Sequence, residues 1–240
     1  MGRVVTFAEL EGKPAGQGVR IAPVTAGETR EMTAEYVRID PGAAWSETAP
    51  AGSDCYLFTA DGSLSIAAGA VTRDMRPQSF ATVEEGTAFT VRNVGGAPAG
   101  VLKIIAPPQP ASGATPGFKG GLTVAARATT PVVPVPEEHK QRIYFVGHGA
   151  ARSERGHAMI VVYDGLTNTA LHHHPNADSL FMLLDGAVQF TVNGKPVVVT
   201  PGQAAYFPAN DQHQLHTAPG HAGASFLEFH IPAAYKTVKA

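Results

Sequence analysis

Closely spaced histidines in the second half of the sequence have the residue type and spacing of metal ligands. His172, His173 and His174 are consecutive. Successive side chains of a β-strand point to opposite faces, so His172 and His174 would share one face while His173 points away. Two imidazoles on one face make half of a metal site. His213, which follows a turn sequence containing Pro, Asn and Asp, is the candidate third ligand from a neighbouring strand.

The distribution of histidine indicates that only the second half uses this chemistry. All ten histidines lie between His139 and His230. We take His230 and His216 as candidate catalytic residues: His230 ends an alternating set with Phe226 and Glu228, whereas His216 would face outward in a regular strand. Four other histidines are expected to be surface or hydrogen-bonded residues, namely His139, His148, His157 and His221. Polar residues that could line a pocket, with their orientation left open, are Tyr163, Gln189, Tyr206 and Gln214.

The elements that position these residues are predicted to be strands. The chain of 240 residues is 44% hydrophobic and contains 26 Gly and 19 Pro, which disfavours a helical protein and favours short elements joined by turns. Apolar runs of about five residues, with Val and aromatic residues at alternate places, are typical of sandwiches and barrels. Such runs are Glu35–Ile39, Val101–Ile105, Met159–Tyr163, Val188–Val192 and Phe226–His230. We therefore expect an all-β protein.

The two halves are related by an internal duplication. Residues 53–62 and 177–186 place Asp, Asp and Gly identically at an offset of 124, and the offset holds downstream without a gap. A repeat of about 100 residues predicts two similar β-domains in tandem. Seven prolines between Pro107 and Pro136 indicate a connector. The predicted organisation is a first domain over 1–106, a Pro/Gly-rich connector over 107–138 and a second domain over 139–240.

At these residues the sequence resembles the cupin superfamily, whose two motifs supply three histidines and a glutamate to a metal. The first motif is matched by Gly165, His172, His174 and Gly186. The second is matched by Gly202, Pro208 and His213, with Asn210 at the family glycine and Thr217 at the family asparagine. The resemblance implies two tandem double-stranded β-helix (jelly-roll) barrels, with the site at the mouth of the second.

Two departures from the family pattern bear on the site. Ser179 stands at the position of the family glutamate, and a hydroxyl is a poor ligand for a divalent ion beside a carboxylate. Asp178 is the alternative ligand, against a turn-stabilising role, because its duplicate Asp54 lies in the copy without histidines. The first copy has Glu47, Ala49, Cys55 and Phe89 near the four ligand positions. We therefore expect a metal-binding second barrel and a metal-free first barrel.

Function follows from the three-histidine site as an expectation. Three neutral imidazoles leave one divalent ion its full charge and about three open positions, which suits a small bidentate oxygen ligand such as a diketone, phenolic or carboxylate substrate. Similar three-histidine cupins include dioxygenases, so an Fe(II) dioxygenase is the favoured reading. The alternatives are an isomerase, decarboxylase or lyase using Mn, Ni or Zn, or a non-enzymatic bicupin that binds a small ligand.

Charge and composition restrict the partners. The formal net charge is −2, so the chain lacks the basic footprint of nucleic-acid-binding proteins. No apolar run has the length needed to span a bilayer, and the single Cys55 agrees with a reducing compartment. We expect a cytoplasmic protein with a small-molecule substrate and no nucleic-acid or membrane partner. A homodimer is compatible with the sequence.

Overall fold

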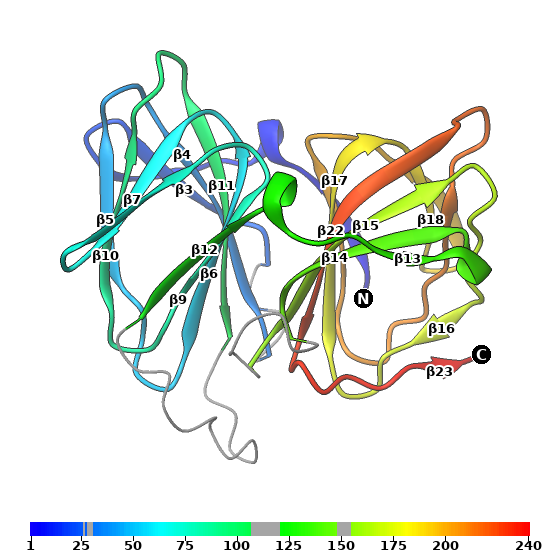
Figure 1. The fold of residues 1–240 in the computed structure, drawn as a ribbon. Coiled ribbons are helices and arrows are strands. Elements are labelled where there is room, and N and C mark those ends of the chain that lie inside the picture. Colours follow the sequence, from blue (N-terminus) through cyan, green and yellow to red (C-terminus); the bar gives the residue numbers. More distant parts are fainter. Residues whose placement is uncertain (26, 28–30, 107–120, 148–154) are drawn as a thin grey trace. The chain divides into compact units, whose positions relative to one another are not determined.

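A computed structural model describes residues 1–25, 27, 31–106, 121–147 and 155–240 (Figure 1). Strands dominate these residues, and the helices among them are three 3-10 turns at Phe7–Glu9, Arg127–Thr129 and Pro136–Glu138. The predicted all-β class is confirmed. None of the helices in this part of the chain is long and apolar enough to cross a membrane.

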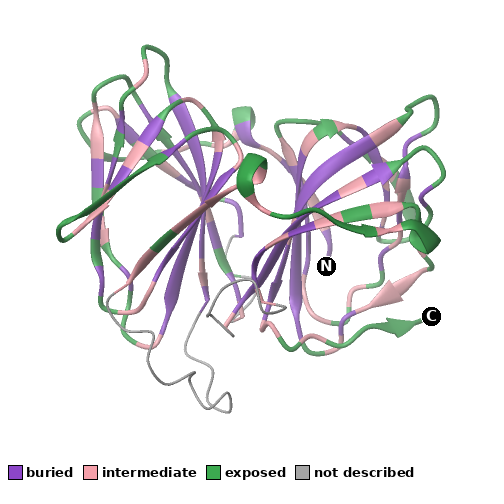
Figure 2. Ribbon diagram, in the orientation of Figure 1, coloured by how far each residue is buried: buried purple, intermediate pink, exposed green. Residues whose placement is uncertain are grey.

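The first compact unit spans Leu10–Thr130 and consists of two sheets. The larger sheet contains, in spatial order, β12 (Leu122–Ala126), β9 (Ser79–Val83), β6 (Asp54–Asp61), β11 (Ala99–Ala106), β4 (Thr33–Ile39), β3 (Val19–Pro23) and β2 (Lys13–Gly16). The smaller sheet contains β5 (Ala44–Thr48), β10 (Ala88–Asn93), β7 (Leu64–Ala68) and β8 (Val71–Met75). The central strands β6 and β11 are buried along most of their length, and Figure 2 shows them in purple.

The second compact unit combines Met1–Glu9 with Pro131–Ala240. Its larger sheet contains, in order, β1 (Arg3–Thr6), β20 (Gln203–Phe207), β17 (Asp178–Gly186), β22 (Gly223–Ile231), β15 (His157–Asp164), β14 (Lys140–Val146) and β13 (Val133–Val135). A three-stranded sheet contains β19 (Lys195–Val199), β18 (Val188–Val192) and β21 (Leu215–Thr217). A separate pair joins β16 (His172–His173) to β23 (Val238–Lys239).

The register of the strands repeats between the units. In the first, Thr59 pairs with Val101 and the ladder then skips Ala60; in the second, Leu183 pairs with Phe226 and the ladder skips Leu184. A shift in register at the same place in both copies is a shared bulge, which bends the strand in the same way. The internal duplication predicted from the sequence is therefore present in the fold as two barrels of matching topology.

The limits of the compact units differ from the predicted domain boundaries. The first strand, β1, pairs with β20 of the second unit, with Val4 opposite Ala205. This pairing covers the edge of β20 and buries Val5, which explains why an N-terminal strand belongs to the C-terminal barrel. The predicted connector also contains strands: β12 pairs with β9 and β13 pairs with β14. Residues 107–120 of the connector lie outside the described residues.

Candidate metal centre

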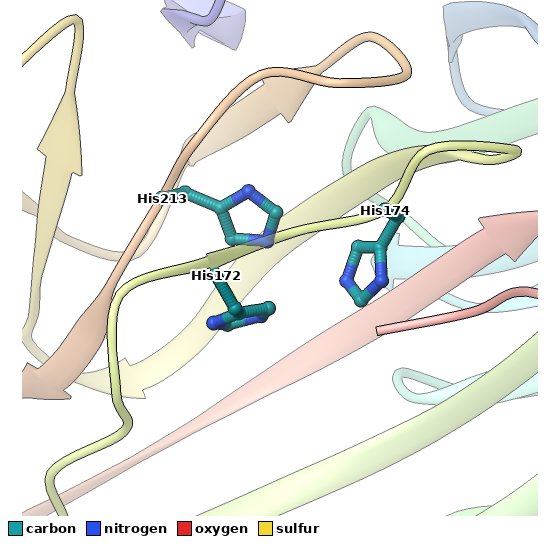
Figure 3. A group of neighbouring side chains, drawn as sticks. All are labelled: His172, His174 and His213. Carbon is teal, nitrogen blue, oxygen red and sulfur yellow. The ribbon is translucent and has the colours of Figure 1, made fainter. Parts of the chain in front are cut away.

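The fold brings together the three histidines predicted as ligands. His172 and His213 face each other across an antiparallel bridge, in which each backbone N–H donates to the other's carbonyl at 3.0 and 2.8 Å. One ring nitrogen from each of His172, His174 and His213 lies within 4.8 Å of those of the other two. Figure 3 shows the three rings approaching one another from two separate segments of the chain. Such spacing allows one ion to contact all three.

Hydrogen bonds fix which nitrogen of each ring is available. The Nδ1 atoms of His172, His174 and His213 lie 2.8, 2.8 and 3.0 Å from the backbone oxygens of Ala170, Lys236 and Asp211. A carbonyl oxygen only accepts, so each Nδ1 must carry the proton and donate. In the neutral ring the lone pair is then on Nε2. Carbonyl-bonded Nδ1 with a free Nε2 is the arrangement in which imidazoles bind metals.

Burial keeps these rings neutral. It lowers the pKa of His172, lowers that of His174 to about 4 and lowers that of His213 to about 3, and the neighbouring imidazoles add to the effect. A neutral imidazole at pH 7 has a free lone pair. The residues therefore fit a metal ion, and His213 adds direct support: its Nε2 is buried and has no hydrogen-bond partner among the described residues. Buried polar atoms are normally paired, and a metal ion would satisfy this one.

The turn before His213 explains a departure from the family motif. Asn210, at the position of the family glycine, has a φ of 71°, in the left-handed region that glycine and asparagine tolerate best. Gly86 occupies the equivalent position in the first barrel, with a φ of 74°. The N–H of Asn210 donates to the carbonyl of His174 at 2.9 Å. This turn thus links the two ligand-bearing segments.

The two residues considered at the glutamate position have other partners. Asp178 is buried, and its carboxylate accepts hydrogen bonds from the Ala209 N–H at 2.8 Å and the Tyr206 hydroxyl at 3.1 Å, which is a turn-stabilising arrangement. It is not part of the histidine cluster. Ser179 is fully buried, and its Oγ lies 2.9 Å from Nδ1 of His230.

Replacing Ser179 with Ala should therefore destabilise the protein without removing metal. The change leaves Nδ1 of the buried His230 without a partner, which should cost about 1 to 3 kcal/mol of unfolding free energy. Denaturant unfolding and metal analysis measure the two quantities. Ser63→Ala, at an exposed position, is the control and should change the unfolding free energy by less than about 0.5 kcal/mol. Loss of metal from the Ser179 variant would instead make this hydroxyl a ligand.

Sequence reasoning gave no role to Glu228, which the structure places at the site. Glu228 lines the same cavity as His172 and His174, and its Oε1 lies 2.8 Å from Nε2 of His230. Burial alone would raise the pKa of Glu228, but the hydrogen bond and charge of His230 outweigh it and lower the pKa to about 2. The carboxylate is therefore ionised at neutral pH. Its alternation with His230 was the signal in the sequence that could have identified it.

The candidate catalytic histidines have different surroundings. His230 is fully buried, its ring centroid lies 4.8 Å from that of His174, and it does not line the cavity. It contacts the site through Glu228. His216 lies on β21 opposite Gln189 and is also absent from the cavity lining, whereas its neighbour Leu215 is part of it. The structure does not bring His216 to the histidine cluster.

Of the other polar residues singled out in the sequence, some line the cavity and others do not. Of the four pocket candidates, Tyr163 lines the cavity, Tyr206 is buried against Asp178, and neither Gln189 nor Gln214 lines it. His157 is not at the surface: it is buried at 7% exposure, with its ring 5.8 Å from that of Tyr144. His139 and His221 are exposed as expected, and His148 lies outside the described residues.

The C-terminal segment forms one wall of the site, which the sequence did not reveal. Tyr235 stacks on His230 with ring centroids 3.9 Å apart and meets His174 edge-on at 5.1 Å. The carbonyl of Lys236 orients His174, and β23 pairs with β16. The last residues therefore hold the ligand segment in place.

A cavity of about 420 Å³ adjoins the histidines. Its apolar wall includes Met159, Phe181 and Leu215, and three acidic and three basic residues also line it. The acidic residues are Glu137, Glu138 and Glu228, and the basic residues are Lys140, Arg142 and Lys239. Lys140 and Arg142 both form ion pairs with Glu138. The space suits a small polar molecule.

Comparison with known proteins found one matching family and several solved structures with a similar fold. Residues 158–230 match the family described as Cupin domain. A protein described as glyoxylate-induced, from Pseudomonas aeruginosa, is 18% identical with a TM-score of 0.77, covering 99% of this chain and 89% of its own. A point mutant of oxalate decarboxylase from Bacillus subtilis is 13% identical with a TM-score of 0.71, covering 98% and 78%. The second barrel therefore contains a region that matches the Cupin domain family.

A third solved structure has a similar fold. Protein YlbA from E. coli is 10% identical with a TM-score of 0.79, covering 100% of this chain and 93% of its own. At these identities the likeness concerns the fold. A search of curated proteins found no match.

The first barrel has different residues at the positions that correspond to the three histidines of the second. Of these residues, Ala49 has no donor atom, and Phe89 is buried with its ring edge-on to Trp45 at 5.3 Å. Glu47 accepts hydrogen bonds from the ammonium of Lys103 at 2.9 and 2.7 Å, and Lys103 is 5% exposed. The Glu47 carboxylate is 29% exposed, and its pairing with a buried ammonium already neutralises it, so it has little affinity for a further cation.

Proposed function

We propose that the C-terminal barrel is a metal-dependent enzyme that acts on a small bidentate oxygen substrate. One divalent transition ion would be held by Nε2 of His172, His174 and His213. The observation that carries this proposal is the buried Nε2 of His213, which has no partner among the described residues, within a cluster of neutral imidazoles. Glu228 adds to it, because a partly buried carboxylate favours a cation nearby.

The favoured reaction is Fe(II)-dependent dioxygenation. Bound at three neutral ligands, Fe(II) would supply a Lewis acid with open positions and a one-electron reductant for O2. The chain's own residues would bind and orient the substrate. Met159, Phe181 and Leu215 provide apolar surface in the cavity, and Glu228, next to Met159 and Phe181, provides a negative charge.

A second candidate is a redox-neutral isomerase, decarboxylase or lyase that uses Mn, Ni or Zn. The observation that favours it is Glu228, because an ionised carboxylate within a water-excluding cavity is suited to accept a proton from a substrate. Oxalate decarboxylase from Bacillus subtilis, which shares the fold, is described as having Mn(II) centres.

Oxygen dependence separates the two candidates. We expect metal-reconstituted protein to consume O2 with one member of a panel of diketones, catechols and thiols. Turnover of that substrate should fall to background under anaerobic conditions. The measurement is O2 uptake alongside product formation, with metal-free protein as the control. Turnover that continues undiminished without O2 would contradict dioxygenation and support the redox-neutral reaction.

A further inference from the structure

Glu228 occupies a defined level of the second barrel. On β22 it pairs with Met159 of β15 and Phe181 of β17, and all three residues line the cavity. One level along, His230 pairs with His157 and Ser179. Glu228 is thus the polar residue within an otherwise apolar level, and its side chain is 16% exposed.

The hydrogen bonds around Glu228 have one consistent direction. An ionised carboxylate only accepts, so His230 donates from Nε2 to Oε1 of Glu228. Nδ1 of His230 lies 2.9 Å from Oγ of Ser179. These two contacts give both ring nitrogens of His230 a hydrogen-bond partner. Oε2 of Glu228 has no hydrogen bond among the described residues. The free oxygen belongs to a side chain that lines the cavity.

No lysine or arginine in the described part of the chain forms an ion pair with Glu228. Its one ion-pair partner there is His230, whereas the cavity's Lys140 and Arg142 are paired with Glu138. A partly buried acceptor that is negatively charged repels a second anion and favours a hydrogen-bond donor.

The first barrel shows how close this position lies to the ligands. Phe226 pairs with Leu183 as Val101 pairs with Thr59, so Glu228, two residues beyond Phe226, corresponds to Lys103. Lys103 contacts Glu47, which stands at the position of the first ligand histidine. A side chain at the Glu228 position therefore projects toward the metal-ligand end of the barrel, although Glu228 itself is not part of the histidine cluster.

We propose that Glu228 selects the substrate by accepting a hydrogen bond from a hydroxyl group next to the substrate's metal-binding oxygen. The substrate class is then a small hydroxy acid or enol rather than a dicarboxylate. The inference rests on the proposed metal site and deepens it by naming the chemical group that the cavity recognises. A dianion would place a second carboxylate against Glu228, whereas a hydroxy acid places a donor there.

Glycolate and oxalate test this selection, because they differ by a hydroxyl against a carboxylate. Each would be titrated calorimetrically into Co(II)-loaded wild-type protein and into the Glu228→Gln and Glu137→Gln variants. Glu137 lines the same cavity at an exposed position and is the matched control. The quantity compared between the proteins is the ratio of the two dissociation constants, oxalate over glycolate. Because Co(II) is the same in each protein, its own preference for one ligand does not affect this comparison.

We expect Glu228→Gln to lower this ratio by about tenfold or more, since a charge-assisted hydrogen bond is lost and a repulsion is removed. Glu137→Gln should leave it within about twofold of wild type. An unchanged ratio in a Glu228 variant that still holds Co(II) would overturn the selection and leave the metal site standing. Absence of bound Co(II) in the wild type would overturn the metal site itself and this inference with it.

Discussion

Replacing His174 with Ala is expected to leave the second barrel folded but without bound metal. The side chain supplies one of three neutral imidazole ligands, and its Nδ1 is held by the Lys236 carbonyl. Removing partners that merely orient a ligand typically costs 10 to 100-fold in metal affinity, so loss of the ligand itself should cost more than about 100-fold. Metal analysis after dialysis and circular dichroism measure the two outcomes.

His221→Ala is the matched control for this experiment. His221 is exposed and lies outside the histidine cluster, so its replacement should leave the metal content at one equivalent. If His174→Ala protein also retains a full equivalent, the ligand assignment is wrong. Loss of both metal and fold would be resolved with His174→Gln, which keeps a polar side chain of similar length but removes the imidazole, and which should be folded and metal-free.

The histidine cluster was predictable because its signal is local. Strand alternation places His172 and His174 on one face, and the family motif identifies His213. The fold class followed from short apolar runs and the duplication. Each of these inferences depends on neighbouring residues or on a repeat, which a sequence displays directly.

What the sequence could not show depends on contacts between distant segments. The tautomer of His174 is set by a carbonyl 62 residues away, and Ser179 reaches His230 across 51 residues. The role of Glu228 becomes visible only when β22 is placed between β15 and β17, because residues on all three strands determine that no lysine or arginine pairs with it. Likewise, the edge covered by β1 is visible only once β20 is known to be its neighbour.

The first barrel has no histidine at the corresponding positions, and other side chains occupy that space. Two side chains fill the space near its ligand positions. Phe89, at the position of the third histidine, is 3% exposed and packs edge-on against Trp45. Lys103 lies with its ammonium 5.2 Å from the centroid of the same Trp45 ring. Apolar packing and a partly buried ion pair therefore stabilise the part of this barrel that corresponds to the histidine cluster of the second.

Phe89→Ala should consequently destabilise the first barrel by about 3 to 5 kcal/mol, since the change removes a buried aromatic ring and leaves a cavity. Trp45 is the single tryptophan of the chain and contacts Phe89, so its fluorescence during denaturant unfolding reports on this barrel. Val94→Ala, at a residue 58% exposed, is the control and should change the unfolding free energy by less than about 0.5 kcal/mol. A loss under about 1 kcal/mol for Phe89→Ala, or a second metal equivalent that disappears in Glu47→Gln, would mean that this barrel has a working pocket rather than a packed core.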